Sequence, residues 1–147
     1  LYIYLHNPGG QWRGTSVKIN KLNYVDEAER VIERLAQNAK KDKLGHPMFL
    51  LTTSKIRNLL SMVSELQTDA QHCSGSELDE ELISRVQYLK MRIAYEAGRE
   101  KAVMEFVRSA DLLNQVAAIG KDRQQLIVFC NYMEALVAYH KYYGGKD

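Results

Sequence analysis

The chain has 147 residues, of which 46% are hydrophobic, and its 20 lysines and arginines nearly balance 18 acidic residues, giving a formal net charge of +2. This length predicts one domain, and the hydrophobic content excludes a disordered or collagen-like chain. The small net charge excludes a histone-like polycation, so any contact with nucleic acid must come from a local basic patch.

Glycines and prolines divide the chain at long intervals. Pro8 and Pro47 are the two prolines, and the glycines that punctuate the rest lie 22 to 30 residues apart. These glycines are Gly45, Gly75, Gly98, Gly120 and Gly144. A β-sandwich needs a turn signal about every 8–12 residues, whereas this spacing suits helices of about 20 residues. We therefore predict an all-α fold, a compact bundle of about five helices.

Residues 1–21 have a different character from the rest. Residues 1–6 alternate like a β-strand, and residues 7–10, Asn-Pro-Gly-Gly, resemble a turn. A lone strand has no evident partner in a helical chain, so the segment is either a strand of the fold or an irregular arm. We assign residues 1–21 to an N-terminal arm and residues 22–147 to a single helical domain.

The first helix is predicted from Tyr24 to Ala39, with Asn23 as its N-cap. Its apolar stripe is Val25, Ala28, Val31, Ile32, Leu35 and Ala36. The second helix is predicted to begin at Thr52 or Thr53, since either hydroxyl can cap it. Its stripe is Ile56, Leu59, Leu60, Val63 and Leu66. Both stripes fall on one face at 100° per residue and predict core positions.

Three further stripes predict the remaining helices. Ser76 is the expected N-cap of the third, with Asp79 completing a capping box, and Gly98 is either its break or a point of close packing. Its stripe is Ile83, Val86, Leu89, Ile93 and Ala97. The stripe of the fourth predicted helix is Val103, Phe106, Val107, Ala110, Leu113 and Ala117. Asp122 and Gln125 cap the fifth, whose stripe is Leu126, Phe129, Cys130, Met133, Leu136, Val137 and His140.

Motifs for catalysis or metal binding are missing. His46, His72 and His140 lie far apart, without C-x-x-C or H-E-x-x-H spacing, and the chain has neither a nucleophile elbow nor a glycine-rich phosphate loop. The acidic run at residues 77–81 could supply a carboxylate pair, but it also fits the first turn of a helix, where acids favour the helix dipole. We expect no enzyme, no catalytic residue, no metal and no cofactor.

Cys73 and Cys130 do not form a disulfide framework, which favours a reducing cytoplasm, and Cys130 is expected to be a small core residue. No apolar run approaches the 18 residues of a membrane-spanning helix, and the start has no signal-peptide pattern. We therefore expect a cytoplasmic protein without a membrane partner.

Basic residues flank several of the apolar stripes, where they indicate either a solvated face or contacts to phosphate. Tyr132, Tyr139 and Tyr143 form a second stripe on the last helix, which favours a core or subunit interface over a base-stacking platform. Residues 52–57 resemble the start of a helix-turn-helix recognition helix, but the preceding helix ends too early for the tight turn that this motif needs.

Three stretches together resemble a known family. They are LTTSKIRNLL (51–60), LKMRIAYEAGRE (89–100) and YMEALVAYHKYYGGKD (132–147), and residues 23–29 fit the family's first helix. The last stretch is the most specific, because a tyrosine-rich helix ending in Gly-Gly-Lys-Asp has no general structural reason to recur. Over about residues 22–147 the chain resembles the small subunit of the type III-A CRISPR effector, the Csm complex.

The resemblance implies an all-α bundle without an active site that acts in antiviral defence. Small subunits of this family stack as a filament inside the effector and line the channel where guide RNA pairs with target RNA. The implied partners are the backbone of that RNA duplex, the backbone and large subunits of the complex, and further copies of the chain. RNA cleavage, single-stranded DNA cleavage and cyclic oligoadenylate synthesis belong to other subunits.

The basic residues within the recognisable stretches are the candidate phosphate contacts. They are Lys55, Arg57, Arg92, Arg99 and Lys141, with Lys90 and Lys101 as weaker candidates. Arg99 has alternatives, since it could anchor the turn after Gly98 or pair with Glu96 or Glu100. Two other functions stay open: a helical adaptor that binds only protein, and a DNA-binding regulator.

Overall fold

The residues that the structure describes, 17–147 in this computed structural model, are mainly helical. The strand considered for residues 1–6 lies outside them. The α-helices are α1 (Tyr24–Asn38), α2 (Arg57–His72), α3 (Glu80–Arg99), α4 (Lys101–Ser109), α5 (Leu112–Ala117) and α6 (Arg123–Tyr142). The 3-10 helix η3 (Thr53–Ile56) precedes α2, and strands β1 (Lys40–Lys41) and β2 (Pro47–Met48) form an antiparallel hairpin. The predicted all-α fold is confirmed, with six α-helices over the described residues.

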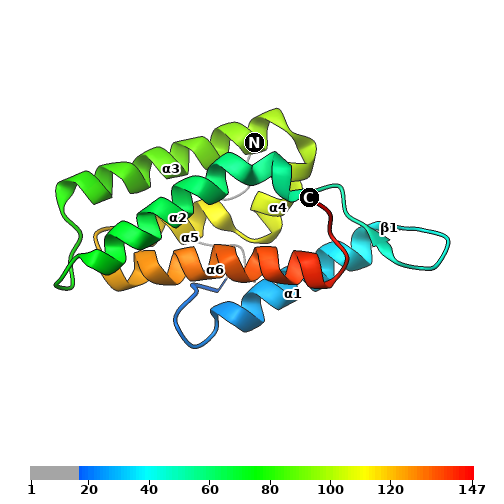
Figure 1. Ribbon diagram of the computed structural model, residues 1–147, viewed down its shortest axis with the longest axis horizontal. Coiled ribbons are helices and arrows are strands. Elements are labelled where there is room, and N and C mark those ends of the chain that lie inside the picture. The colour runs from blue at the N-terminus through cyan, green and yellow to red at the C-terminus, as the bar shows by residue number, and fades with distance from the viewer. Residues whose placement is uncertain (1–16) are drawn as a thin grey trace.

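The long helices share one end of the bundle. α2 begins where α3 and α6 finish, and α1 also finishes there, beside the hairpin (Figure 1). We call this the η3 end, and define it as η3, the start of α2, the last two turns of α3, the last turn of α6 and residues 143–147.

α6 is buried on most of its circumference. Its predicted stripe is buried except for the half-buried Val137, and Val128 and Tyr132 are buried as well. Both α1 and α2 make their largest contacts with this helix. Burial of each large apolar side chain contributes about 1.5–3 kcal/mol, so α6 organises the core. Two predicted core positions are wrong: Val25 is 41% exposed, and Ala117 is exposed at the end of α5.

Two glutamines fix the segment before α1 to the bundle. Gln115 of α5 accepts from the Ile19 N–H at 3.1 Å and donates to the Val17 carbonyl at 2.7 Å, while Gln125 of α6 donates to the Ile19 carbonyl at 2.8 Å. Ile19 is 1% exposed. These bonds satisfy a buried backbone that has no helix or sheet partner of its own.

The helix starts follow the expected chemistry only in part. The Asp122 carboxylate accepts from the Gln125 N–H at 3.2 Å, which confirms it as the cap of α6. Ser76 is not the cap of α3: Asp79 is, accepting from the Leu82 N–H at 2.9 Å. The Ser76 carbonyl instead accepts from the Arg123 N–H at 3.0 Å, which joins this segment to the start of α6.

The first two helices differ from expectation at their starts. Asn23 precedes α1, but its side chain makes no cap hydrogen bond and instead accepts from the Asn20 N–H at 2.7 Å. Thr52 precedes η3, and α2 begins only at Arg57. The hairpin and residues up to 52 separate α1 from η3, so the tight turn of a helix-turn-helix is not formed there.

The predicted fourth helix is divided. α3 continues through Gly98, and the break falls at Glu100, whose backbone is extended. Asp111 then separates α4 from α5 with a φ of 57° in the left-handed region, which aspartate tolerates better than most residues. The interpretation of Gly98 as a helix break is therefore wrong, and no atom lies within 4 Å of where its Cβ would stand.

Gly98→Ala should stabilise the chain by about 0.4–1 kcal/mol, because alanine restricts the unfolded chain and meets open space in the helix. Urea unfolding of the variant measures this change. Gly120→Ala is the control, since its φ of +54° penalises alanine and the variant should lose stability. Destabilisation by Gly98→Ala would contradict the packing described here.

Candidate nucleic-acid interface

The five candidate phosphate contacts gather at the η3 end. Lys55 lies in η3, Arg57 opens α2, Arg92 and Arg99 lie in the last two turns of α3, and Lys141 lies in the last turn of α6. Elements far apart in sequence therefore bring these cations to one end of the molecule (Figure 1). Of the weaker candidates, Lys90 is half-buried on α3 and Lys101 is exposed at the start of α4.

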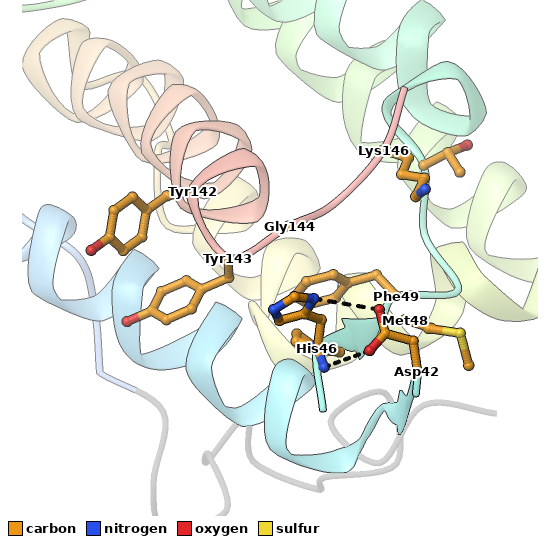
Figure 2. Close-up of a pocket in the computed structure, with 10 residues that line it drawn as sticks. Asp42, His46, Met48, Phe49, Tyr142, Tyr143, Gly144 and Lys146 are labelled. Atoms are coloured by element: carbon orange, nitrogen blue, oxygen red, sulfur yellow. Dashed lines mark hydrogen bonds and ion pairs between the residues drawn. The ribbon is translucent and has the colours of Figure 1, made fainter. Parts of the chain in front are cut away.

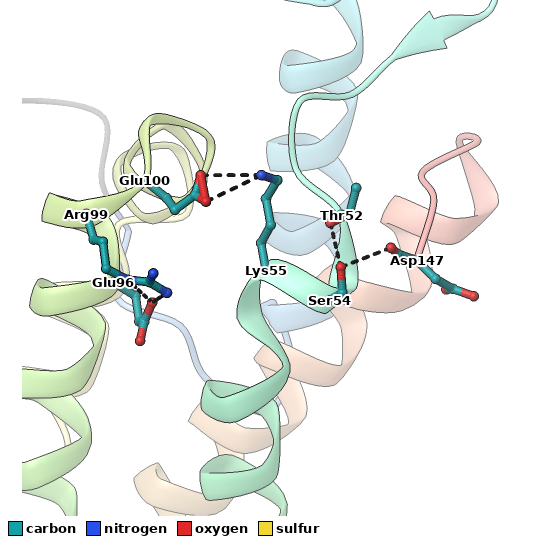
Figure 3. A network of polar contacts seen from close by, with 7 residues as sticks. All are labelled: Thr52, Ser54, Lys55, Glu96, Arg99, Glu100 and Asp147. Carbon is teal, nitrogen blue, oxygen red and sulfur yellow. Dashed lines mark hydrogen bonds and ion pairs between the residues drawn. The ribbon is translucent and has the colours of Figure 1, made fainter.

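An ion pair joins η3 to the junction of α3 and α4. Lys55 Nζ lies 3.3 Å from Glu100 Oε1, and each side chain is 35% exposed (Figure 3). A pair this accessible to water contributes at most about 1 kcal/mol, so it orients Lys55 more than it stabilises the fold. Because Glu100 directly follows Arg99, this ion pair also brings the Lys55 side chain close to the Arg99 end of α3.

Glu96 holds two of the candidate arginines. Its side chain is 5% exposed, and its two oxygens accept from Arg92 Nη2 at 2.8 Å and from Arg99 Nη2 at 2.7 Å. Arg99 Nε adds a longer bond of 3.2 Å, and these contacts with Glu96 raise the pKa of the Arg99 guanidinium. A buried carboxylate needs such charge-assisted partners, so the three side chains fix one another.

Tyr95 lies between the same two arginines. The guanidinium carbon of Arg92 is 4.9 Å from the centre of its ring, and that of Arg99 is 5.9 Å away. The tyrosine is nevertheless 55% exposed. The last two turns of α3 therefore present an accessible aromatic ring bordered by two oriented cations.

The Gly-Gly-Lys-Asp tail binds the start of η3. The Lys146 carbonyl accepts from the Thr53 N–H at 3.1 Å, and Thr53 Oγ1 donates to Asp147 Oδ1 at 3.3 Å. Ser54 Oγ donates to the Asp147 carbonyl oxygen at 3.2 Å (Figure 3). The tail thus supplies partners for backbone and hydroxyl groups immediately before Lys55.

Gly145 and His140 explain how the tail reaches η3. A Cβ at Gly145 would lie 2.1–2.3 Å from three atoms of the His140 ring, so only glycine fits there. The His140 Nε2 donates to the Leu51 carbonyl at 2.9 Å, because a carbonyl only accepts. His140 Nδ1 is buried and has no hydrogen-bond partner among residues 17–147, and burial lowers the pKa of the imidazole.

A hollow of about 930 Å³ lies between the hairpin and the tail (Figure 2). Asp42 accepts from the backbone N–H groups of Leu44 and His46 at 2.9 and 2.8 Å, and these bonds, led by His46, lower the pKa of the Asp42 carboxyl. Thr52, Tyr142, Tyr143 and Lys146 also line the hollow. Within residues 17–147, no group of three His, Cys, Asp or Glu side chains is arranged to hold a metal ion.

Comparison with known proteins decides the family. Residues 27–146 match the family model described as Csm2 Type III-A. The chain belongs to the Csm2 family. It is 49% identical over 125 residues to the CRISPR system Cms protein Csm2 of Streptococcus thermophilus, covering 85% of this chain and 94% of that protein. The Csm2 protein of Mycobacterium tuberculosis is 46% identical over the same coverage, and that of Enterococcus italicus is 35% identical over 136 residues.

The Csm2 family assignment confirms the resemblance drawn from the three sequence stretches. The tyrosine stripe of α6 belongs mainly to the core: Tyr132 is 2% exposed and donates to the Ala110 carbonyl at 2.9 Å, and Tyr143 donates to Glu29 at 3.2 Å. No helix within residues 17–147 is long and apolar enough to cross a bilayer.

Sequence reasoning missed the supporting residues of this site. The sequence pattern indicates Glu96 only as one possible partner of Arg99 and does not single out Tyr95. The available signal was spacing, since Glu96 follows Arg92 by four residues and precedes Arg99 by three, which places all three on one helix face.

The buried His140 predicts a pH-dependent stability. Its pKa is lowered from the ordinary 6.5 in the folded chain, so the unfolded chain binds the proton more readily. Stability is therefore complete above about pH 6.5 and falls as the pH drops from there toward the folded pKa. His140→Phe keeps a ring against Gly145 and should flatten this slope in urea unfolding between pH 7.5 and 5, whereas the exposed His46→Phe should keep it. An unchanged slope in His140→Phe would rule out this role.

Proposed function

We propose that the chain is a non-catalytic small subunit of the Csm complex that lines the guide RNA–target RNA channel and contacts the RNA backbone with its η3 end. The single observation that carries this proposal is that Lys55 of η3 lies beside the Arg99–Glu100 end of α3, to which an ion pair with Glu100 joins it, although the two elements are far apart in sequence. The positions of Lys55 and Arg99 are supported by the tail that holds η3 and by Glu96.

The charge of the molecule suits backbone recognition of an A-form duplex. The major groove of such a duplex is too deep and narrow for side chains to read, so proteins bind it through shape, phosphates and 2′-hydroxyls. A few phosphate contacts in each copy are weak alone. Repeated along a filament of copies they sum through multivalency, which is consistent with a net charge of only +2.

Acidic side chains of the chain already neutralise most of the candidates. Lys55 pairs with Glu100, both arginines pair with Glu96, and Lys141 Nζ lies 3.5 Å from Asp147. Arg57 is exposed and has no ion-pair partner within residues 17–147. An RNA phosphate must therefore compete with a carboxylate at Lys55 and Lys141, whereas Arg57 is available without that cost.

Reversing the charges of Lys55 and Arg57 together to glutamate should weaken target-RNA binding equally across sequences, because phosphate contacts carry no base information. The magnitude of the salt slope of binding should fall by about 1 for each lost contact. Fluorescence anisotropy of the full chain with labelled RNA at several salt concentrations measures both effects.

Arg85→Glu with Lys121→Glu is the matched control, because the change in net charge is the same. Arg85 lies near the start of α3 and Lys121 just before α6, and both helices start at the end of the bundle opposite to η3 (Figure 1). Equal loss of binding in the control would mean that only total charge matters. Crosslinking from target RNA to this chain within the assembled complex separates RNA contact from a purely protein-binding adaptor, which would give no crosslink.

Glu100→Gln should strengthen RNA binding, whereas the charge reversal of Lys55 and Arg57 should weaken it. Removing the carboxylate frees Lys55 from its ion pair, so RNA affinity should rise by up to about fivefold, the range set by an exposed salt bridge. Glu105→Gln on the next helix provides the control for loss of one negative charge. A rise that is the same in both variants would assign the effect to net charge instead of Lys55.

A further inference from the structure

The exposed face of α3 carries two tyrosines that differ in one respect. Tyr88 is 54% exposed and Tyr95 is 55% exposed, but within residues 17–147 guanidinium groups border only the Tyr95 ring. An accessible aromatic ring beside cations is the arrangement on which nucleic-acid bases stack without regard to sequence. Tyr88 offers the same exposed ring without the cations. Comparison of the two tyrosines therefore distinguishes the effect of the ring from the effect of the neighbouring guanidinium groups.

The arginines beside Tyr95 keep hydrogen-bonding capacity for an outside acceptor. A guanidinium has five N–H donors, and Glu96 accepts from one nitrogen of Arg92 and from two nitrogens of Arg99. The Arg99 side chain is 55% exposed and that of Arg92 is 28% exposed. Because Glu96 is buried beneath them, both arginines are oriented before any ligand arrives.

We propose that Tyr95, Arg92 and Arg99 form a nucleotide subsite, in which one unpaired RNA base stacks on the Tyr95 ring and its phosphate takes the remaining guanidinium N–H groups. Glu96 is the positioning residue of this subsite. The inference rests on the proposed RNA contact of the η3 end, and adds to it a base-binding element that paired RNA does not use.

Continuity favours RNA over a protein partner at this place. Glu100 follows Arg99 directly and pairs with Lys55, so the Arg99 side of this subsite lies next to the Lys55 cation of η3. A backbone that runs past η3 meets the arginines of α3 next. An acidic protein segment would bind the arginines but gain little from the Tyr95 ring. Binding of RNA should therefore depend on that ring, whereas binding of an acidic protein segment should not.

The test compares a short single-stranded RNA with an abasic strand of the same length and phosphate number. The full chain should bind the intact RNA more tightly at low salt, by roughly 5- to 100-fold, the range of one stacked base. Tyr95→Ala should bring this ratio close to one, while Tyr95→Phe should preserve it. Tyr88→Ala is the matched control and should leave the ratio unchanged.

The outcomes separate this inference from the proposed function. If Tyr95→Ala leaves the ratio intact, or Tyr88→Ala lowers it equally, the stacking site is wrong. If the Lys55 and Arg57 charge reversal still weakens both strands, the proposed backbone contact survives that result. Failure of the wild-type chain to bind either strand at low salt would overturn both.

Glu96→Gln tests the positioning role. It should weaken binding of both strands, because the arginines lose the charge that orients them, yet leave the ratio between intact and abasic RNA above one. Urea unfolding of the same variant shows how much stability is lost. A stability loss without any change in binding would assign Glu96 a purely structural role.

Discussion

The need to cover α6 governs this molecule. Its buried side chains point in several directions, including Val128, Tyr132 and Met133, so no single neighbour can shield them from water. α1 and α2 supply the main cover, and Gln125 of α6 also ties down the segment before α1. α3 in turn packs on α2, α4 and α5, and α2, α3 and α6 meet at one end of the bundle.

Charged side chains at that end are positioned by specific contacts of the tail and of a buried carboxylate, in addition to the helices that carry them. The tail reaches Thr53 because Gly145 passes over the His140 ring, and the arginines of α3 are oriented because Glu96 is buried between them. The contacts of the tail and of Glu96 each orient a surface cation before binding. The cation therefore loses less conformational entropy on association.

Local patterns predicted the parts of the fold that local forces determine. α1 and the Asp122 cap followed from periodicity and short-range hydrogen bonding. Ser76 failed as a cap because its carbonyl is bonded to Arg123, a partner on another helix. The candidate cations were likewise found from the recognisable stretches, but the burial of Glu96 was not, since a carboxylate between two arginines on a helix is ordinarily solvated.

The central place of α6 also has a consequence for synthesis of the chain on the ribosome. α1 emerges early, yet its buried face (Ala28, Val31, Ile32, Leu35 and Ala36) packs mainly on the helix that is translated last among those described. The nascent chain must therefore carry an unshielded apolar helix until α6 leaves the exit tunnel. Transiently exposed apolar surface of this kind is prone to aggregation until the partner helix covers it.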